Sequence, residues 1–387
     1  MPKTKIIHIH SDLKFLFDSQ RFVNNNFENI IIVIGDKKKY KDQYNGTVLF
    51  FNFSARNIRT IISYCKTADM VVLYDLNFSK AYIANRLPNS IKVVWRFFGL
   101  ELYGKMPEVV FSEQTIRASK EISVKYDYLF FRNLLGRAFN KIRFGTNSKT
   151  EFKKAAFNRV DYFHGLSEKE YDFLKEFWPQ LPPFLQKDYS NLKGNNESNR
   201  EINYYHKSEN NLIILGNNRS AYNNHLDLLD LIKDSNSKNK YKFLMFFNYG
   251  RNNYYADLVR NKANKIEEIE VLEDFLEIEK FNQIYFEASA LVINGYRQMA
   301  MGNIFTAIKN KTKIYLSTNN VIFNWLKEEG FSVFSIEEFV IDLDNNNIAL
   351  KEFEILRNQN QLVTFTKKYN QEEFHNSLSL ILNEKTK

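Results

Sequence analysis

The sequence predicts an α/β protein with two doubly wound domains, each a mostly parallel sheet covered by helices on both faces. Short β-type runs alternate with helical patterns in the first half, a proline-marked irregular stretch follows, and the alternation then begins again. A chain of 387 residues also exceeds the usual size of one hydrophobic core, and its 44% hydrophobic content is enough to fill two. Two domains of similar size that face each other across a cleft are therefore expected.

The first half holds six runs that are typical of buried strands. They cover residues 5–10, 29–35, 47–53, 69–75, 91–97 and 160–164. A helix is expected to begin near Ser167. The following stretch contains Pro179, Pro182 and Pro183 and then an Asn-, Ser- and Lys-rich run. It predicts a linker over residues 179–210, after an N-terminal domain over residues 1–178.

The second half repeats the same alternation without a close sequence repeat. Its predicted strands cover residues 212–215, 242–247, 270–272, 290–294, 313–316 and 331–334. They define a C-terminal domain over residues 211–345. Residues 346–387 are helical in character and are expected to cross back and brace the N-terminal domain. Ligands of open α/β sheets bind beyond the carboxyl ends of the strands, which predicts a site in the shared cleft.

The loop after residues 212–215 is predicted to bind an anion. Gly216 permits a tight turn, and Asn223 or Asn224 can cap the next helix. Free backbone N–H groups at such a turn and at a helix start favour a phosphate. The candidate ligands are Gly216, Asn217, Asn218, Arg219 and His225, and the apolar stripe of the helix is Leu226, Leu229 and Ile232. An ordinary polar loop, with His225 supporting the cap, remains the alternative.

A second anion-binding loop is predicted after residues 290–294. Arg297 and Gln298 precede Gly302 and Asn303, which open a helix. A fixed guanidinium charge and a helix N-terminus both suit phosphate oxygens. Two such loops at one edge of a sheet predict a diphosphate site.

Between the two loops, Asn248 and Tyr249 end another predicted strand. Tyr249 either stacks on a nucleotide base or is an ordinary surface aromatic. The chain contains neither GxxxxGK[ST] nor GxGxxG. This weighs against a P-loop ATPase and a dinucleotide-dependent dehydrogenase.

The excess of basic over acidic residues lies entirely in the first half of the chain. Residues 1–190 carry 30 Lys and Arg against 19 Asp and Glu, a net of +11, whereas residues 191–387 have a net of −2. Residues 117–159 alone carry eleven basic and three acidic side chains. An amphipathic basic helix in this segment would suit an anionic membrane surface, and an ordinary solvated helix is the alternative. Nucleic-acid binding ranks last because no recognised motif is present, so no nucleic-acid partner is expected.

The sequence contains neither a recognisable signal peptide nor a membrane-spanning segment. The N-terminus lacks a signal-peptide apolar run, and no segment approaches roughly 18 uninterrupted apolar residues. The single cysteine, Cys65, fits a reducing compartment and is interpreted as a buried apolar residue. A cytoplasmic protein that does not span a membrane is expected.

At the level of motifs the chain resembles glycosyltransferase family 56. The resemblance is carried by GNNRSAYNNH (216–225), FFNYGRNNYYADL (246–258), VLEDFLEIEKFNQIY (271–285) and YRQMAMGNIFTAI (296–308), and in outline by HIHSD (8–12) and WRFFGLELY (95–103). It departs from the family at Phe98 to Glu101, where Trp-Gly-small-Asp is expected, and at Met299, where a glutamine is expected. The resemblance implies a GT-B fold, with two Rossmann-like domains, and an inverting reaction. It also implies a TDP-sugar donor held mainly by the C-terminal domain and a polyprenyl-linked acceptor.

Direct displacement at an anomeric carbon needs a base for the acceptor hydroxyl and donors that stabilise the departing diphosphate. Candidate bases are Glu101, Asp12 and His10, each just beyond the carboxyl end of a predicted strand; capping or ion pairing is the alternative role. Arg, Asn and helix N-termini can stabilise the leaving group, so no metal and no cofactor are expected.

The sequence thus predicts an inverting glycosyltransferase that moves a deoxyamino or related sugar from a nucleoside diphosphate to a lipid-linked saccharide. Such an enzyme would work at the inner face of the cytoplasmic membrane. Two alternatives stay open: a transferase of the same fold with another donor and a soluble glycan acceptor, and a non-catalytic protein that binds a nucleotide or an anionic polymer.

Overall fold

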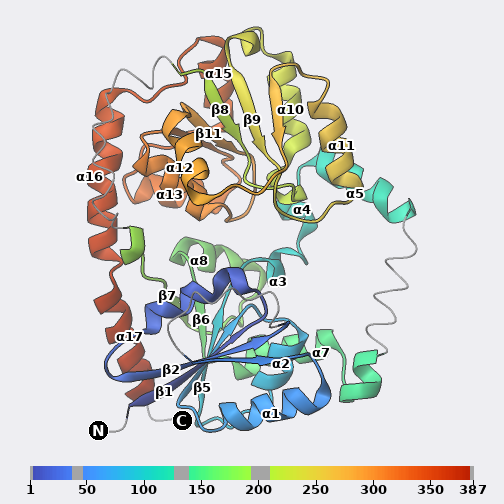
Figure 1. Cartoon of the computed structure of the whole chain (residues 1–387), viewed down its shortest axis with the longest axis vertical. Coiled ribbons are helices and arrows are strands. Elements are labelled where there is room, and N and C mark those ends of the chain that lie inside the picture. Colours follow the sequence, from blue (N-terminus) through green and yellow to red (C-terminus); the bar gives the residue numbers. More distant parts are fainter. Residues whose placement is uncertain (1–2, 37–46, 126–138, 193–209, 384–387) are drawn as a thin grey trace. The chain divides into compact units, whose positions relative to one another are not determined.

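The computed structural model describes residues 3–36, 47–125, 139–192 and 210–383 (Figure 1). The chain divides into two compact units. Unit 1 comprises Met1–Leu102, Tyr128–Ser190 and Tyr369–Lys387, and unit 2 comprises Tyr103–Asp127 and Asn191–Lys368. Each unit is built around one parallel sheet.

Unit 1 contains a seven-stranded sheet in the order β3-β2-β1-β4-β5-β6-β7, and every pair of neighbours is parallel. Its strands are β1 (Thr4–His10), β2 (Phe27–Ile34), β3 (Thr47–Phe51), β4 (Met70–Tyr74), β5 (Lys92–Arg96), β6 (Tyr162–Gly165) and β7 (Phe184–Gln186). All five residues of β4 are buried, because a central parallel strand has helices on both faces.

Helices connect these strands and begin at side chains that cap them. Ser54 and Ser167 each accept a hydrogen bond from the backbone N–H three residues later, so the helix predicted to begin near Ser167 is confirmed. The helices of unit 1 that lie wholly within the described residues include η1 (Leu13–Phe22), α1 (Ala55–Cys65), α2 (Phe78–Ala84), α7 (Ser148–Lys154), η3 (Ala155–Arg159), α8 (Glu168–Phe177) and α17 (Gln371–Asn383). Two short helices cross the boundary between the units, α3 (Leu100–Tyr103) and η4 (Ser190–Leu192).

Strand β7 lies inside residues 179–210, which the sequence predicts to be a linker. It pairs with β6 at the edge of the sheet, and the N–H of Phe163 donates to Pro183 O at 2.8 Å. Prolines are tolerated immediately before an edge strand because their missing N–H falls outside the ladder. The sheet therefore extends into the predicted linker, of which residues 193–209 lie outside the described residues.

Unit 2 contains a six-stranded parallel sheet in the order β10-β9-β8-β11-β12-β13. Its strands are β8 (Leu212–Leu215), β9 (Lys242–Phe246), β10 (Ile269–Leu272), β11 (Ala290–Ile293), β12 (Lys313–Leu316) and β13 (Phe334–Ser335). The last strand begins three residues later than predicted. Phe331 and Val333 are buried without joining the ladder, and Ser335 forms a capping box with Glu338 at the next helix.

The helices of unit 2 include one whose buried stripe the sequence predicts. Leu226, Leu229 and Ile232 of α10 are all buried in the core of the unit, which confirms the stripe. The helices are α4 (Pro107–Val110), α5 (Glu113–Lys125), η6 (Ala221–Asn223), α10 (His225–Asp234), η7 (Lys238–Lys240), α11 (Tyr254–Ala263), α12 (Ile278–Glu287), α13 (Met301–Lys309), α14 (Val321–Glu328), α15 (Ile336–Asp344) and α16 (Glu352–Lys368).

A segment from the first half of the chain belongs to unit 2, although the sequence assigns it to the N-terminal domain. The hydroxyl of Ser112 donates to Asp227 on α10, Gln114 Nε2 donates to Asp230 Oδ2 at 2.9 Å, and Ala118 lies in the core of unit 2. In the sequence these partners are 115 and 116 positions apart. No pattern within a short stretch of sequence predicts contacts between residues so far apart in the chain.

The C-terminal residues are divided between the units in a similar way. Helix α16 contacts unit 2, where Lys368 Nζ lies 2.9 Å from Glu329 Oε1. Helix α17 places Phe374, Leu378 and Ile381 in the core of unit 1. The tail thus supplies one helix to each unit.

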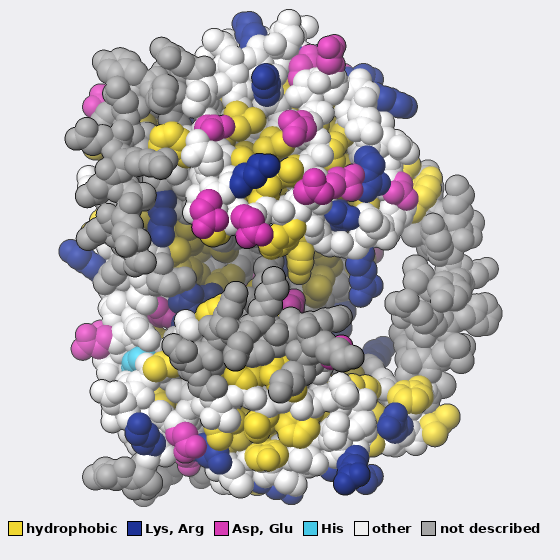
Figure 2. Space-filling model, viewed as in Figure 1, with side chains coloured by type: hydrophobic (Ala, Val, Ile, Leu, Met, Phe, Trp, Pro, Cys, Tyr) yellow, Lys and Arg dark blue, Asp and Glu magenta, His cyan; other side chains and the backbone are white. Residues whose placement is uncertain are grey.

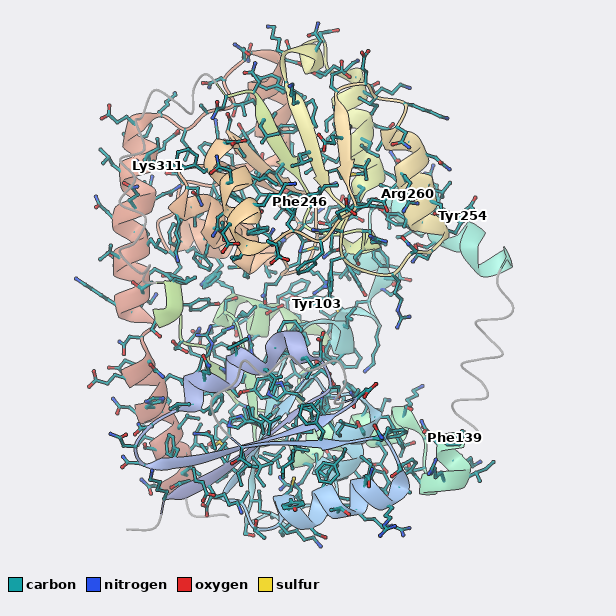
Figure 3. The ribbon with its side chains drawn as sticks, in the orientation of Figure 1. Tyr103, Phe139, Phe246, Tyr254, Arg260 and Lys311 are labelled. Atoms are coloured by element: carbon teal, nitrogen blue, oxygen red, sulfur yellow. The ribbon has the colours of Figure 1, made fainter. Side chains whose placement is uncertain are left out.

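The basic segment 117–159 is described only in part, because residues 126–138 lie outside the described ranges. Residues 139–144 are helical, and Phe139 and Ile142 are 49% and 87% exposed (Figure 3). On the visible face of unit 2, basic and acidic side chains are mixed (Figure 2). Within the described parts of the chain, no helix combines the length and the apolar character needed to cross a membrane.

Candidate functional site

The two predicted anion-binding loops begin at neighbouring strands of unit 2. Strands β8 and β11 pair in parallel, and the N–H of Gly216 donates to Val292 O at 2.8 Å. Farther along, Asn224 Nδ2 donates to Asn294 O at 3.1 Å. The loops therefore lie side by side at the carboxyl edge of one sheet, where open α/β sheets bind ligands.

Gly216 makes the tight turn that the sequence predicts. Its φ of +64° lies in the left-handed region, which favours glycine. A Cβ atom here would also lie 3.2 Å from both Asn223 Oδ1 and His225 Nε2. The two polar side chains thus close over the backbone of the turn.

Several buried polar atoms around this turn lack a hydrogen-bond partner among the described residues. They are Asn217 Oδ1, Asn223 Oδ1, and both ring nitrogens of His225. Buried polar groups in proteins are almost always paired, because desolvation without a partner costs about 1–3 kcal/mol. A polar ligand at the turn would supply the missing partners.

His225 is the first residue of α10 and its side chain is buried. Burial lowers the pKa of its imidazole to about 4. The ring is therefore neutral near pH 7 and offers one N–H donor and one lone pair. A neutral donor can bind a phosphate oxygen without bringing a second buried charge.

Arg297 from the second loop reaches the first loop. Its guanidinium carbon lies 4.4 Å from the centre of the Tyr222 ring and 5.6 Å from that of Tyr103. Its Nη1 donates to Gln298 O at 3.1 Å, whereas its buried Nε has no acceptor within the described parts of the chain. The rings of Tyr222 on the first loop and of Tyr103 on α3 thus hold the Arg297 guanidinium in place.

Gly302 and Asn303 occupy the start of α13. Residue Ala300 at the N-cap has φ +58° and provides no side-chain cap, so the first N–H groups of the helix are left for a ligand or water. Gly302 is exposed, and Asn303 Nδ2 donates to the hydroxyl of Tyr285 at 2.7 Å. Asn303 therefore offers its backbone to an anion, while its side chain is held by α12.

Arg219, Asn248 and Tyr249 occupy the side of the site next to β9. The Nε of Arg219 donates to Phe247 O at 2.7 Å, Nη1 donates to Asn252, and Nη2 lies 4.0 Å from Glu273. These contacts favour a structural role for Arg219 over direct phosphate contact. Tyr249 is 45% exposed and Asn248 is partly buried.

The candidate bases lie at the carboxyl edge of the unit 1 sheet. Glu101 Oε1 accepts from Trp95 Nε1 at 3.2 Å and from the N–H of Phe98 at 3.4 Å, whereas Oε2 is buried without a partner in the described residues. Burial raises the pKa of the Glu101 carboxyl, and Asp75 adds to the effect. A carboxylate with a raised pKa is a stronger base once it is ionised.

His10 and Asp12 differ sharply in their surroundings. His10 ends β1, stacks on Tyr74 at 3.7 Å between ring centres, and has both ring nitrogens buried without a partner among the described residues. Burial, together with His8 and Lys80, holds the pKa of His10 well below its usual range. Asp12 is exposed.

Lys80 and Asp75 join this group without having been singled out in the sequence. The buried Nζ of Lys80 donates to Asp75 Oδ2 at 2.7 Å and to Tyr74 O. Burial lowers the pKa of Lys80, whereas the charges of Asp75, Glu101 and Asp12 raise it. Asp75 has φ +68° directly after β4. A carboxylate at the end of a predicted strand was the available signal for Asp75, and Lys80 had none.

No group of His, Cys, Asp and Glu suited to hold a metal ion occurs in the described ranges. Comparison by sequence finds no protein-family model and no curated protein that matches the chain. Comparison by structure finds many similar proteins of known structure.

Three of these structures show what the two sheets resemble. HepE of Anabaena, solved with UDP and glucose, has a TM-score of 0.65 at 10% identity and covers 99% of this chain and 100% of its own. A glycosyltransferase of Rickettsia africae has a TM-score of 0.61 at 12% identity and covers 99% of each chain. The α-glucosyltransferase AGT, solved with UDP, has a TM-score of 0.57 at 10% identity, with 99% of this chain and 100% of that chain covered. The chain has the GT-B fold. That fold accounts for both parallel sheets and confirms the fold class predicted from the sequence.

Proposed function

We propose that this GT-B protein is a glycosyltransferase whose unit 2 binds a nucleoside diphosphate sugar. The observation that carries the proposal is a set of buried polar atoms that have no partner among the described residues and lie on the two loops after β8 and β11. They belong to Asn217, Asn223, His225 and Arg297. HepE and AGT, which share the fold, were both solved with UDP. A diphosphate can accept from His225 and from Arg297 Nε, and hydroxyl groups of the sugar can donate to the amide oxygens of Asn217 and Asn223.

The diphosphate would be bound by groups of different kinds. Arg297 supplies a fixed positive charge, the uncapped start of α13 supplies backbone N–H groups, and His225 supplies a neutral donor. Asn223 was not among the ligands predicted from the sequence; its unpartnered Oδ1 is an acceptor and would bind a hydroxyl group of the donor. These groups can stabilise the negative charge that develops on the departing diphosphate without a metal ion.

For the reaction we propose direct displacement with inversion. The acceptor oxygen forms a bond to the anomeric carbon, the bond from that carbon to the diphosphate oxygen breaks, and the acceptor proton passes to a base on unit 1. Glu101, Asp12 and His10 remain the candidates, and the unpartnered Oε2 of Glu101 supports Glu101 first. Lys80 and Asp75 would set the charge around it.

The finer assignment rests on the resemblance to glycosyltransferase family 56. It favours a TDP-linked deoxyamino sugar as donor and a lipid-linked saccharide as acceptor. The exposed Phe139 and Ile142 beside Lys141 and Arg143 support a peripheral contact of unit 1 with an anionic membrane. UDP-, TDP-, GDP- and CMP-sugars are the donors to test.

The donor site is tested by Arg297→Ala in the full chain. We expect weaker binding of the nucleoside diphosphate. If Arg297 contacts the developing negative charge, kcat/KM should fall by an amount equivalent to a loss of about 3 kcal/mol of transition-state stabilisation. Binding is measured by titration calorimetry and turnover by release of nucleoside diphosphate. The matched control is Arg117→Ala, since Arg117 is an exposed arginine of the same unit. Equal binding and turnover in both variants would place the diphosphate elsewhere.

A further inference from the structure

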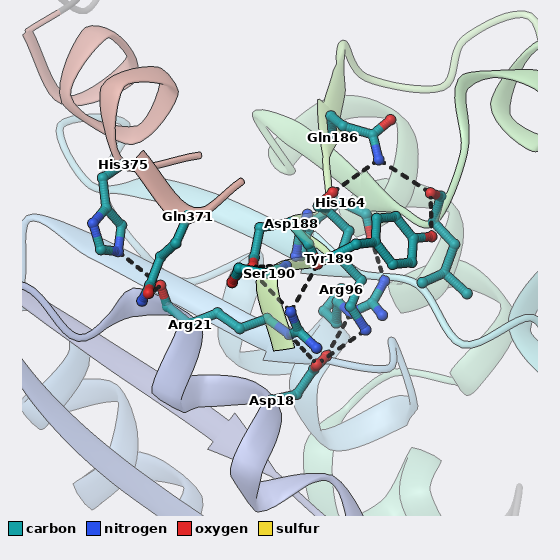
Figure 4. Close-up of polar contacts among 12 residues, drawn as sticks. Asp18, Arg21, Arg96, His164, Gln186, Asp188, Tyr189, Ser190, Gln371 and His375 are labelled. Carbon is teal, nitrogen blue, oxygen red and sulfur yellow. Dashed lines mark hydrogen bonds and ion pairs between the residues drawn. The ribbon is translucent and has the colours of Figure 1, made fainter. Parts of the chain in front are cut away.

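Unit 1 contains a second group of charged side chains that the proposed reaction does not use. We call it the Asp18 cluster. Its members are Asp18, Arg21, Arg96 and Asp188, which Figure 4 labels, together with Lys187. Asp18 and Arg21 lie on η1 directly after β1, Arg96 ends β5, and Lys187 and Asp188 directly follow β7. All five therefore lie at or beyond the carboxyl ends of parallel strands, where this class of sheet binds ligands.

One carboxylate in the cluster is shared by three cations. Asp18 Oδ1 lies 2.8 Å from Arg21 Nε and 3.1 Å from Lys187 Nζ, and Asp18 Oδ2 lies 2.8 Å from Arg96 Nε. The three cations hold the pKa of Asp18 well below its usual range, although burial alone would raise it. Asp18 is therefore an anion at any pH near neutrality.

The second carboxylate compensates only one of these cations. Asp188 Oδ2 lies 2.8 Å from Arg21 Nη1, while its Oδ1 accepts from the N–H of Ser190 at 3.0 Å and from the Ser190 hydroxyl. With Lys187 protonated, three cations face two carboxylates, and the cluster carries one net positive charge. An uncompensated charge away from water is costly, so the cluster is suited to a further anion.

The geometry leaves donors for such an anion. The hydrogen bonds of Arg21 and Arg96 use Nε and Nη1 of each guanidinium, with Arg96 Nη1 directed to His164 O at 3.1 Å. Among the described residues, the Nη2 group of each arginine and two protons of Lys187 have no acceptor, so they can bind a further anion. The side chains of Arg21 and Lys187 are 13% and 12% exposed, which leaves a limited approach from solvent.

The state of Lys187 agrees with a missing counter-ion. Burial, followed by the charges of Arg96 and Arg21, lowers the pKa of Lys187 to about 7, even though Asp18 acts in the opposite direction. A lysine whose only role was to pair with Asp18 would gain a raised pKa from that pairing. Here burial and the two neighbouring arginines together outweigh the effect of Asp18 on the pKa of Lys187.

We propose that the Asp18 cluster binds a phosphate group, and that this group belongs to the acceptor of the transfer reaction. The second part rests on the proposed function, because it takes unit 1 as the acceptor side. Two sources share this chemistry, a soluble sugar phosphate and a phosphate attached to a lipid. A phosphate supplies one or two negative charges and several acceptor oxygens, which suit one excess positive charge and three cations whose donors are only partly used.

Binding of inorganic phosphate to the full chain tests the site without any donor. Thermal unfolding is followed with phosphate and with chloride at equal ionic strength, because a ligand that binds the native state raises its unfolding temperature. We compare the wild type with Lys187→Met and Lys187→Arg, and use Lys66→Met as the control because Lys66 is an exposed lysine of unit 1. Arg297→Ala is included because the donor site of unit 2 can also bind phosphate.

The wild type, Lys187→Arg, Lys66→Met and Arg297→Ala are expected to be stabilised by phosphate. Lys187→Met is expected to bind phosphate about tenfold more weakly, since one charge-assisted hydrogen bond is lost. Without phosphate, Lys187→Met should be as stable as the wild type, because two arginines then face two carboxylates. Glucose 6-phosphate and farnesyl phosphate are then added separately. The compound that stabilises the protein more than inorganic phosphate does shows whether the bound phosphate belongs to a soluble sugar or to a lipid.

Three results would overturn the proposal. The first is that phosphate does not raise the unfolding temperature of the wild type. The second is that Arg297→Ala abolishes this rise, and the third is that Lys187→Met is stabilised by phosphate as much as the wild type is. The first and third exclude the Asp18 cluster, and the second assigns the response to unit 2. A failure of the donor proposal would be seen separately, as unchanged nucleotide binding in Arg297→Ala, and would leave the phosphate result intact.

Discussion

At the scale of single residues, the candidate donor site is defined by polar atoms that the fold buries without satisfying. His225 and Asn223 both approach Gly216 closely, and a Cβ at this position would lie 3.2 Å from a polar atom of each. Stability alone would favour apolar side chains or a closed set of hydrogen bonds at these positions. Local rules are broken in this way where a ligand completes the structure.

Gly216→Ala tests this arrangement at one atom. The substitution adds a Cβ at a φ of +64° and places it against Asn223 and His225, so we expect a loss of about 1–3 kcal/mol in the free energy of unfolding and weaker nucleotide binding. Denaturant unfolding and calorimetry measure the two effects.

Gly302→Ala is the matched control for that substitution. A Cβ at Gly302 meets nothing within 4 Å, and alanine is the better helix former by about 1 kcal/mol. We expect unchanged or higher stability. If Gly216→Ala behaved like Gly302→Ala, the close approach around the turn would not exist in solution.

At the scale of elements, the strands were the part of the fold that the sequence predicted best. Central parallel strands such as β4 and β8 are continuous apolar runs bounded by polar or turn-forming residues, so their positions can be predicted from the local sequence. The assignment of α5 to unit 2 could not be predicted, because it depends on contacts with α10 more than a hundred positions away. Edge strand β7 was missed for a related reason: three residues after a pair of prolines carry little periodicity.

The candidate site was predictable to a similar extent. The loops after β8 and β11 were recognisable because glycine and polar residues follow apolar strands. The Asp18 cluster was not, because its charged residues come from three distant segments and each resembles an ordinary surface charge in the sequence. Lys80, buried on α2 beside the candidate bases, was missed in the same way.

Asn224 joins the elements of unit 2 and provides a test at this scale. Its side chain accepts from the N–H of Ser112 at 2.9 Å and donates to Asn294 O, and its backbone has φ +46°. Asn224→Ala leaves two buried backbone groups unpaired in a strained conformation, so we expect a loss of about 2–4 kcal/mol in the free energy of unfolding. Urea unfolding measures it.

Asn264→Ala is the control, since Asn264 is exposed at the end of α11. It should change the free energy of unfolding by less than about 0.5 kcal/mol. Amide hydrogen exchange adds a positional readout, with faster exchange expected in α5 of the Asn224→Ala protein. Equal stability of the two variants would mean that α5 is held to unit 2 by other contacts.

At the scale of the whole molecule, the two units are each assembled from separate stretches of chain. Unit 1 includes the C-terminal residues Tyr369–Lys387, which contain α17, and unit 2 includes Tyr103–Asp127 from the first half of the chain. Both units also bury histidines. His8, His10 and His164 lie in unit 1 and His225 lies in unit 2. The protonation of histidine therefore depends on the folded state of both units.

These four histidines predict loss of stability in mild acid. Burial lowers the pKa of His8 and His225 to about 4, and holds the pKa values of His10 and His164 well below their usual range. In the unfolded chain each imidazole takes up its proton near pH 6.5, so between about 6.5 and 4 the unfolded state binds more protons. The free energy of unfolding is therefore highest above about pH 6.5 and falls as the pH decreases, by up to about 1.4 kcal/mol per pH unit for each histidine. Urea unfolding at a series of pH values measures the slope, and His225→Gln should reduce it by the share of one histidine. A free energy of unfolding that stays constant between pH 7 and pH 5 would show that these imidazoles are not buried in the neutral form.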